Sequence, residues 1–276
     1  MTGHKSRKTK EGGGNNEAQE AEDHARLQVR VVYQVIRQEG EEQMERPAAS
    51  LWWSGLAAGL SISFSLLAQA LLLRALPHAE WSQLVVGFGY SVGFLMVVLA
   101  RQQLFTESTI TVILPLLAHP TRRNGLLSLR MWALVLCANI AGTFVSAIFC
   151  TFAPVISPEI HTAMLEISRH ALAYDWWQML FRGISAGFLI AVMVWLIPSA
   201  EGAEFHIVVV MTYLVAIGGF AHIVAGSMEA FMMVLAGEQS AIYLLWNFAI
   251  PVLLGNIIGG TVLFGVLSYA QVMHEL

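Results

Sequence analysis

Charged residues are scarce in this sequence. Only 12% of its 276 residues are Asp, Glu, Lys or Arg, whereas 56% are hydrophobic. Soluble domains usually carry about 25% charged residues, so the composition excludes an ordinary soluble protein. It indicates an integral membrane protein, whose partner is the lipid bilayer. It offers no basic surface of the kind that binds nucleic acid.

Cysteine is equally rare, and clusters of reactive side chains are missing. The two cysteines, Cys137 and Cys150, lie in or near one apolar segment, so we expect buried free thiols rather than a disulfide. No nucleophile with a neighbouring base stands out, and the histidines show no metal-ligand spacing. We therefore expect no enzyme activity, no metal site and no cofactor.

The few basic residues are unevenly placed. All three lysines and five arginines come before Pro47, in a tail rich in Gly and Glu. Near the end of this tail, Val32, Val35 and Ile36 would share one face of a helix, which predicts an amphipathic helix at the membrane surface. A charged helix with no part in gating fits the same residues equally well. Residues 1–47 are expected to form a cytoplasmic tail.

Six long apolar segments follow the tail. They run over Ala48–Leu73, Leu84–Leu117, Leu126–Ala153, Trp176–Pro198, Phe205–Ala236 and Ala241–Tyr269. One crossing of a bilayer needs about 20 residues, and the second and fifth segments are longer. Polar or glycine-rich stretches, Ala100–Thr109 and Gly218–Ser227, interrupt these two. The sequence predicts an all-α integral membrane domain over 48–272 with six transmembrane helices, of which the second and fifth are broken.

The two halves of this domain, 48–153 and 176–270, echo each other. Gly55–Gly59 in the first segment resembles Gly183–Gly187 in the fourth, and Asn139–Thr143 in the third resembles Asn256–Thr261 in the sixth. Three crossings per half place the halves in opposite orientations. Paired interruptions in inverted halves predict a binding site near the middle of the membrane. Small residues that let helices pack closely would also explain the glycines, but not the matched interruptions.

The charges of one loop predict the orientation. Arg122, Arg123 and Arg130 connect the second and third segments, on the same side as the basic tail. By the positive-inside rule this side is the cytoplasm, and six crossings return the C-terminus to it. We expect a multi-pass membrane protein with both termini in the cytoplasm.

Ionisable residues lie in or close to the interruptions. His222 is flanked by glycines, Arg101 belongs to the first interruption, and Glu229 follows His222 by about two helical turns. Ionisable groups at such a depth are functional candidates. We expect His222 to face a pore, with a hydrogen-bonded core histidine as the alternative, and Arg101 to pair with Glu229 and brace the pore loops. Arg101 capping backbone carbonyls, with Glu229 reaching the lipid headgroups, is the competing interpretation. Arg182 is expected to reach the membrane interface.

Three motifs resemble those of one known family. Leu104-Phe105-Thr106, Gly219-Phe220-Ala221-His222 and Gly255-Asn256-Ile257-Ile258-Gly259-Gly260, with the six-segment plan, resemble the formate/nitrite transporter family over about residues 45 to 270. The resemblance implies a homopentamer in which each subunit has an aquaporin-like inverted repeat and its own pore. Gln103 and Ala221 replace acidic residues of the better-known members, and Gly187 and Gly226 replace asparagines. These departures indicate a less characterised inner-membrane branch.

The same resemblance implies roles for individual residues. Thr106 would face His222, and apolar constrictions would lie on either side. The implied pore residues are His222, Thr106, Leu104, Phe105, Tyr90, Phe94 and Val215. We expect Gln103, Asn139 and Asn256 to support the pore loops. Arg169 or His170 would supply the positive charge that the family places at the pore entrance.

The features together favour a transport function. Helix N-termini at both interruptions would attract an anion, apolar constrictions would admit a neutral molecule more readily than a charged one, and a histidine can hold or pass a proton. We expect a channel or transporter for a small monovalent anion or its conjugate acid, in the formate, nitrite or hydrosulfide class, passive or proton-coupled. The alternatives are a non-conducting membrane scaffold or sensor and an aquaporin-like pore for neutral solutes. The absence of any Asn-Pro pair argues against the pore for neutral solutes.

Overall fold

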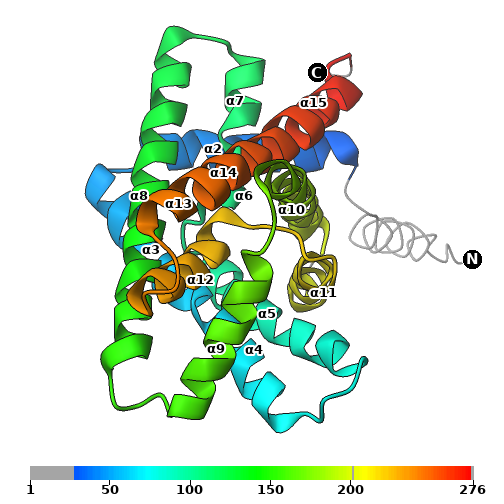
Figure 1. Cartoon of the computed structure of the whole chain (residues 1–276). Coiled ribbons are helices and arrows are strands. Elements are labelled where there is room, and N and C mark those ends of the chain that lie inside the picture. Colours follow the sequence, from blue (N-terminus) through cyan, green and yellow to red (C-terminus); the bar gives the residue numbers. More distant parts are fainter. Residues whose placement is uncertain (1–27, 201, 275–276) are drawn as a thin grey trace, which may run out of the picture.

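The computed structural model describes residues 28–200 and 202–274, and every regular element in these ranges is a helix (Figure 1). Five helices are long and apolar enough to cross a membrane: Ala48–Ala75, Ser82–Leu99, Arg122–Phe152, Trp176–Ser199 and Ala241–Val272. The expected segment Phe205–Ala236 is divided into two shorter helices. The all-α membrane architecture predicted from composition is therefore confirmed.

The described elements follow one another without long connections. In chain order they are α2 (Val29–Glu45), α3 (Ala48–Ile62), α4 (Phe64–Ala75), α5 (Ser82–Leu99), α6 (Phe105–Thr111), α7 (Ile113–Ala118), α8 (Arg122–Phe152), α9 (Pro158–Ala171), α10 (Trp176–Leu196), η1 (Ile197–Ser199), α11 (Glu204–Ile217), α12 (Ile223–Leu235), α13 (Ala241–Leu244), η2 (Leu245–Ala249), α14 (Ile250–Ile257), η3 (Ile258–Gly265) and α15 (Val266–Val272). The last five form one long rod with two π-helical stretches, η2 and η3.

Several helices begin at residues whose side chains accept from the first free backbone N–H groups. Thr121 caps α8, Ser157 caps α9 and Ser240 caps α13. Asp175 and Gln178 form a reciprocal capping box at the start of α10. These ordinary caps contrast with α12, which begins at a histidine within the apolar part of the chain.

The helix α5 ends in a hydrogen-bonded turn formed by a left-handed residue. Arg101 has a φ of 52°, and its N–H donates to the carbonyl of Val98 at 3.0 Å. The N–H of Gln102 donates to the carbonyl of Val97 at 3.0 Å. This pair of bonds is the Schellman arrangement, in which glycine is the usual left-handed residue. An arginine in that conformation carries backbone strain.

The helix α11 ends in the same way. Gly219 has a φ of 59°, and its N–H donates to the carbonyl of Ala216 at 3.0 Å. The N–H of Phe220 donates to the carbonyl of Val215 at 2.9 Å. In both halves the chain then runs extended for a few residues before the next helix starts, at α6 and at α12, near the middle of the molecule (Figure 1).

The repeated glycines lie where helices of each half touch. A Cβ added to Gly142 in α8 would come within 2.8 Å of the Cα of Gly59 in α3. A Cβ added to Gly187 in α10 would come within 2.7 Å of the Cα of Asn256 in α14. The small residues thus serve close helix packing, as the alternative explanation proposed. They also bring the asparagine of each half against the neighbouring backbone.

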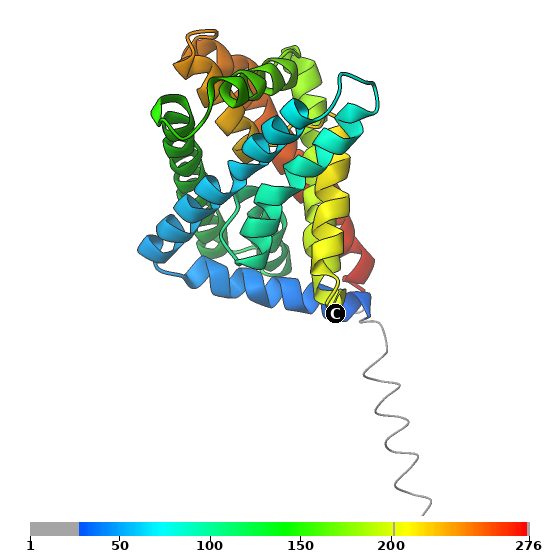
Figure 2. The same ribbon diagram turned by 90° about the horizontal axis from the view of Figure 1, so that it is seen from below.

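The amphipathic helix α2 lies along one end of the molecule, across the ends of other helices (Figure 2). Val32, Tyr33 and Ile36 are buried, and they pack in one cluster with Ile110 and Leu114. Val35, which was expected on the same apolar face, is 42% exposed, and a role of this helix at the membrane surface stays a prediction. Tyr33 and Ile36 lie on the stripe of α2 that the neighbouring helices cover, so this face of the helix packs against the protein.

Candidate functional site

Asn139 holds the first interruption in place. Its side chain is fully buried in α8. Its Oδ1 accepts from the backbone N–H of Phe105 at 2.9 Å, and its Nδ2 donates to the carbonyls of Gly55 at 2.8 Å and Gln103 at 2.9 Å. One amide therefore joins α8, α3 and the extended chain before α6. Both of its N–H donors are used.

Asn256 holds the second interruption by the same contacts. Its Oδ1 accepts from the backbone N–H of Ile223 at 2.9 Å, and its Nδ2 donates to the carbonyls of Gly183 at 2.8 Å and Ala221 at 3.0 Å. It too is fully buried. The two halves thus use one hydrogen-bond pattern, and the interruptions that they support are equivalent positions in the fold.

His222 and Thr106 meet where the two interruptions face each other. The His222 Nε2 lies 2.6 Å from the Thr106 Oγ1. Thr106 is fully buried and His222 is 2% exposed. The two residues are far apart in the chain, and each stands at the start of a half-helix, Thr106 in α6 and His222 as the cap of α12. The structure brings these two predicted pore residues together.

The second ring nitrogen of His222 fixes where its proton sits. Nδ1 accepts from the backbone N–H of Ala225 at 3.2 Å, so it carries no hydrogen in the neutral ring. The neutral imidazole then holds its proton on Nε2, which donates to the Thr106 hydroxyl oxygen. A proton on Nδ1 would break the cap of α12.

The aromatic residues expected at constrictions gather beside His222. The Tyr90 and Phe94 rings lie 5.2 Å apart, and the Phe94 ring meets the His222 ring edge-on at 5.0 Å. Val215 is fully buried and Leu104 is 1% exposed. Leu104 precedes α6 as His222 precedes α12, so the apolar Leu104 and the polar His222 hold equivalent places in the two halves. Phe105 packs against Trp132, with ring centroids 6.0 Å apart.

A cavity of about 660 Å³ leads to His222, and we call it the vestibule. Helix α9 forms part of its wall. Tyr90 and Val215 of the expected constriction line it too. Its polar lining includes Gln69, His170, Tyr174, Arg182, His222 and Glu229.

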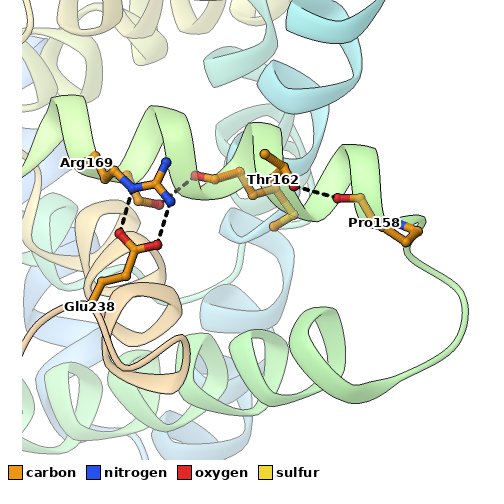
Figure 3. A network of polar contacts seen from close by, with 6 residues as sticks. Pro158, Thr162, Arg169 and Glu238 are labelled. Atoms are coloured by element: carbon orange, nitrogen blue, oxygen red, sulfur yellow. Dashed lines mark hydrogen bonds and ion pairs between the residues drawn. The ribbon is translucent and has the colours of Figure 1, made fainter.

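Of the two candidates for a positive charge at the entrance, only His170 lines the vestibule. Arg169 binds Glu238 instead (Figure 3), with Nε to Oε2 at 2.6 Å and Nη2 to Oε1 at 2.5 Å. The hydrogen bond from Arg169 lowers the pKa of the Glu238 carboxyl below its ordinary value. This bidentate pair ties α9 to the loop after α12.

The expected ion pair between Arg101 and Glu229 is wrong. Arg101 is exposed, and within residues 28–200 and 202–274 it has neither an ion pair nor a side-chain hydrogen bond to a backbone carbonyl. Glu229 is 8% exposed and lines the vestibule rather than reaching the lipid headgroups. The physical reason is the helix period, which places Glu229 on the stripe of α12 that carries Gly226 and His222.

The sequence interpretation also missed part of the vestibule wall. Arg182 packs at this wall: its guanidinium carbon lies 3.4 Å from the centre of the Tyr174 ring, and Nη1 donates to the carbonyl of Gly219. Its expected reach to the membrane interface stays a prediction. Arg182 thus clamps the left-handed turn that ends α11. Its position next to Gly183, in the repeated glycine motif, was the available signal. Gln69 and Phe248 carried no comparable signal.

Known proteins are similar to this chain in sequence. The sequence profile described as formate/nitrite transporter matches residues 30–270. The inner membrane protein YfdC of Escherichia coli (strain K12) is 39% identical over 255 residues, covering 92% of this chain and 82% of the relative. The formate channel FocA of Haemophilus influenzae is 27% identical over 248 residues, covering 80% of this chain and 86% of the relative.

Solved structures share the fold. A pentameric formate channel with formate bound matches with a TM-score of 0.66 over 82% of this chain and 98% of that chain, at 20% identity. An FNT family ion channel matches with a TM-score of 0.74 over 88% of this chain and 98% of that chain, at 16% identity. FocA and both solved structures are named as channels, and the matching family is one of transporters rather than enzymes. By sequence and by fold, the chain belongs to the formate/nitrite transporter family.

Proposed function

We propose that this protein is a channel or transporter for a small monovalent anion or its conjugate acid, in the formate, nitrite or hydrosulfide class. The observation that carries the proposal is the 2.6 Å contact between Thr106 and His222. It places a hydroxyl and an imidazole N–H at the start of α12, in a buried site that the vestibule reaches. Two such groups can orient a small oxyanion or acid without a full buried charge.

The surroundings of this contact favour passage of the neutral acid. Tyr90, Phe94, Leu104 and Val215 are all buried apolar or aromatic side chains. An unpaired anion loses its hydration among such groups at a cost of several kcal/mol, whereas the uncharged acid crosses more cheaply. Transport coupled to a proton, or passive diffusion of the acid, follows from this difference. Both FocA of Haemophilus influenzae and the fold relative are formate channels.

The proposed membrane topology has six crossings. Helices α3 with α4, α8, α10 and the rod from α13 to α15 each cross once. The two broken crossings are α5 with α6 and α7, and α11 with α12. Residues 1–47 form the cytoplasmic tail and 48–272 the transmembrane domain with its inverted halves. The proposed location is a bacterial inner membrane, which the name of the inner membrane protein YfdC from Escherichia coli supports. Both termini would then face the cytoplasm by the positive-inside rule, and the vestibule would open to the other side.

Homopentamer formation is part of the proposal. The support is a fold relative that is a pentameric formate channel. Large apolar side chains on the outside of the subunit would contact lipid or neighbouring subunits, among them Leu129, Phe149, Phe181 and Leu267. Each subunit would carry its own pore, because Thr106 and His222 come from one chain.

Flux through liposomes that contain the purified protein tests the proposal. Formate, nitrite, acetate and water are offered in turn, from neutral to mildly acidic pH, and His222→Ala serves as the matched variant. Flux of formate or nitrite that His222→Ala reduces supports the proposal. Water flux without acid flux would identify an aquaporin-like pore, and no flux of any solute would identify a scaffold or sensor.

A further inference from the structure

Glu229 is a carboxyl group that the site described above does not use. It is 8% exposed, and its side chain lines the vestibule. Among the residues that the structure describes, it has no ion pair and no hydrogen-bond partner. A carboxyl buried in a membrane protein without a cation is costly unless it has a proton or a ligand to bind.

Glu229 and His222 line the same cavity and lie on one stripe of α12. Residues 222, 226 and 229 share one stripe of α12, because side chains three and four positions apart lie above one another on a helix. A Cβ built on Gly226 would lie 3.7 Å from the Glu229 Oε2, so the carboxyl lies beside Gly226, between Glu229 and His222 along the helix. The Phe248 ring also packs over Gly226, with its Cζ 2.7 Å from the same Cβ position, and it lines the vestibule with both groups.

His222 is poorly placed to supply a proton. Its Nδ1 accepts from the backbone of Ala225, and its Nε2 is bonded to Thr106. Loading a further proton on the ring would remove the cap of α12. The neutral tautomer can donate a hydrogen bond to a passing solute, but the proton that neutralises an anion must come from another group.

We propose that Glu229 exchanges protons with the transported anion in the vestibule. The inference rests on the proposed function. In the step, the O–H bond of the Glu229 carboxyl breaks and a new O–H bond forms on the substrate oxygen, so a carboxylate and a neutral acid result. A hydronium ion of the external solution, which reaches the vestibule through its water, then returns a proton to Glu229 and leaves neutral water. The neutral acid passes His222 and Thr106 and releases its proton to water on the far side, so one proton moves with each anion.

Other titratable groups that share the vestibule do not replace Glu229. His170 and Glu166 are exposed residues of α9 on its wall, Tyr90 and Tyr174 are phenols, and Arg182 is held by Tyr174 and Gly219. The elements that contact α12 add few charges. These are Arg74 near the end of α4, Glu107 on α6, three arginines near the start of α8, Arg122, Arg123 and Arg130, and the remaining charged or titratable side chains of α9, Glu159, His161 and Arg169.

The test records formate influx and internal acidification together in liposomes that contain the full-length protein. Empty liposomes give the background of formic acid that crosses lipid alone. For the wild type we expect acidification in step with formate, rising as the external pH falls. In Glu229→Gln the rate at neutral pH should fall by about a hundredfold, the lower range of what a positioned proton donor contributes. Glu159→Gln, an exposed carboxyl of α9 that does not line the cavity, should leave the rate and its pH profile unchanged.

The outcomes separate this inference from the proposed function. If Glu229→Gln carries formate at the wild-type rate with the wild-type pH profile, the inference is overturned and the proposed function stands. If the wild type carries neither formate nor nitrite, both fail.

Methylammonium is the contrasting probe. Flux of this cation in place of the acids, if it is lost in Glu229→Gln, would show that Glu229 binds a cation and would overturn both the inference and the proposed function. Should Glu229→Gln not fold, Glu229→Asp decides. The aspartate side chain is one methylene shorter, so its carboxyl is drawn back and coupled flux should be slower. A flux in Glu229→Asp equal to that of the wild type at every pH contradicts the inference.

Discussion

Arg101 and Gly219 hold the same place in the two halves of the protein. Each is the left-handed residue that ends a helix, with φ of 52° and 59°, and each is followed by the extended chain that leads to a half-helix. Glycine adopts this conformation without strain, whereas arginine does not. One half therefore carries a strained residue at the position where the other half has the usual one.

Replacing Arg101 by glycine should stabilise the protein. The substitution relieves the left-handed strain, and the greater freedom of glycine in the unfolded chain offsets part of that gain, which leaves about 0.5–1 kcal/mol. Thermal unfolding of the detergent-solubilised protein measures the effect. Gly219→Ala is the mirror experiment and should lower the unfolding temperature. A lower unfolding temperature for Arg101→Gly would show that its side chain stabilises the loop.

Truncating either buried asparagine should damage the fold to a similar extent. Asn139→Ala and Asn256→Ala each remove three hydrogen bonds and leave a backbone N–H of the following half-helix without its acceptor. We expect a loss of at least about 3 kcal/mol, because a buried polar group left without its partner costs about 1–3 kcal/mol. Yield and thermal unfolding report it. Asn247→Ala, which removes one bond to the Tyr243 carbonyl at a partly exposed site, is the control and should change little.

For formate flux, the hydroxyl of Thr106 should matter more than the size of its side chain. Thr106→Val keeps the shape but leaves the His222 Nε2–H without its acceptor, whereas Thr106→Ser keeps the hydroxyl. Loss of one buried hydrogen bond of about 1–2 kcal/mol corresponds to a formate flux lower by about five- to thirtyfold. Liposome flux of the two variants gives the comparison. Equal flux in Thr106→Val and the wild type would mean that the contact does not act in transport.

The Arg169–Glu238 pair should weaken in acid. The folded-state pKa of Glu238 is lowered by its hydrogen bond to Arg169, so the contribution of the pair is present above the unfolded pKa of about 4.3 and is lost as the pH falls through the folded value below it. The unfolding temperatures of the wild type and Glu238→Gln should therefore differ at neutral pH and converge below pH ~4. The difference should be small, because both side chains are partly exposed. If the difference in unfolding temperature persists in acid, the Arg169–Glu238 pair is not its cause.

The sequence predicted much of the site. The remaining side-chain contacts became clear only in the tertiary structure. The paired interruptions and the two repeated asparagines were visible as motifs, and the contact of Thr106 with His222 followed from family resemblance. The expected pairing of Arg101 with Glu229 was wrong, and the contacts of Arg182 with Tyr174 and Gly219 were not foreseen. Nothing local in the sequence says which surface of a helix faces the cavity.

The sequence by itself determined that this is an all-helical membrane protein with matched halves. Run length and hydropathy are read against the fixed thickness of a bilayer, and repeated motifs need no partner to be recognised. Only the tertiary structure decided that Glu229 faces the vestibule with His222, that Arg182 clamps the turn at Gly219 and that Arg101 stands free of Glu229. The reason is that a side chain's partner depends on how helices far apart in the chain rotate against one another, and packing sets that rotation.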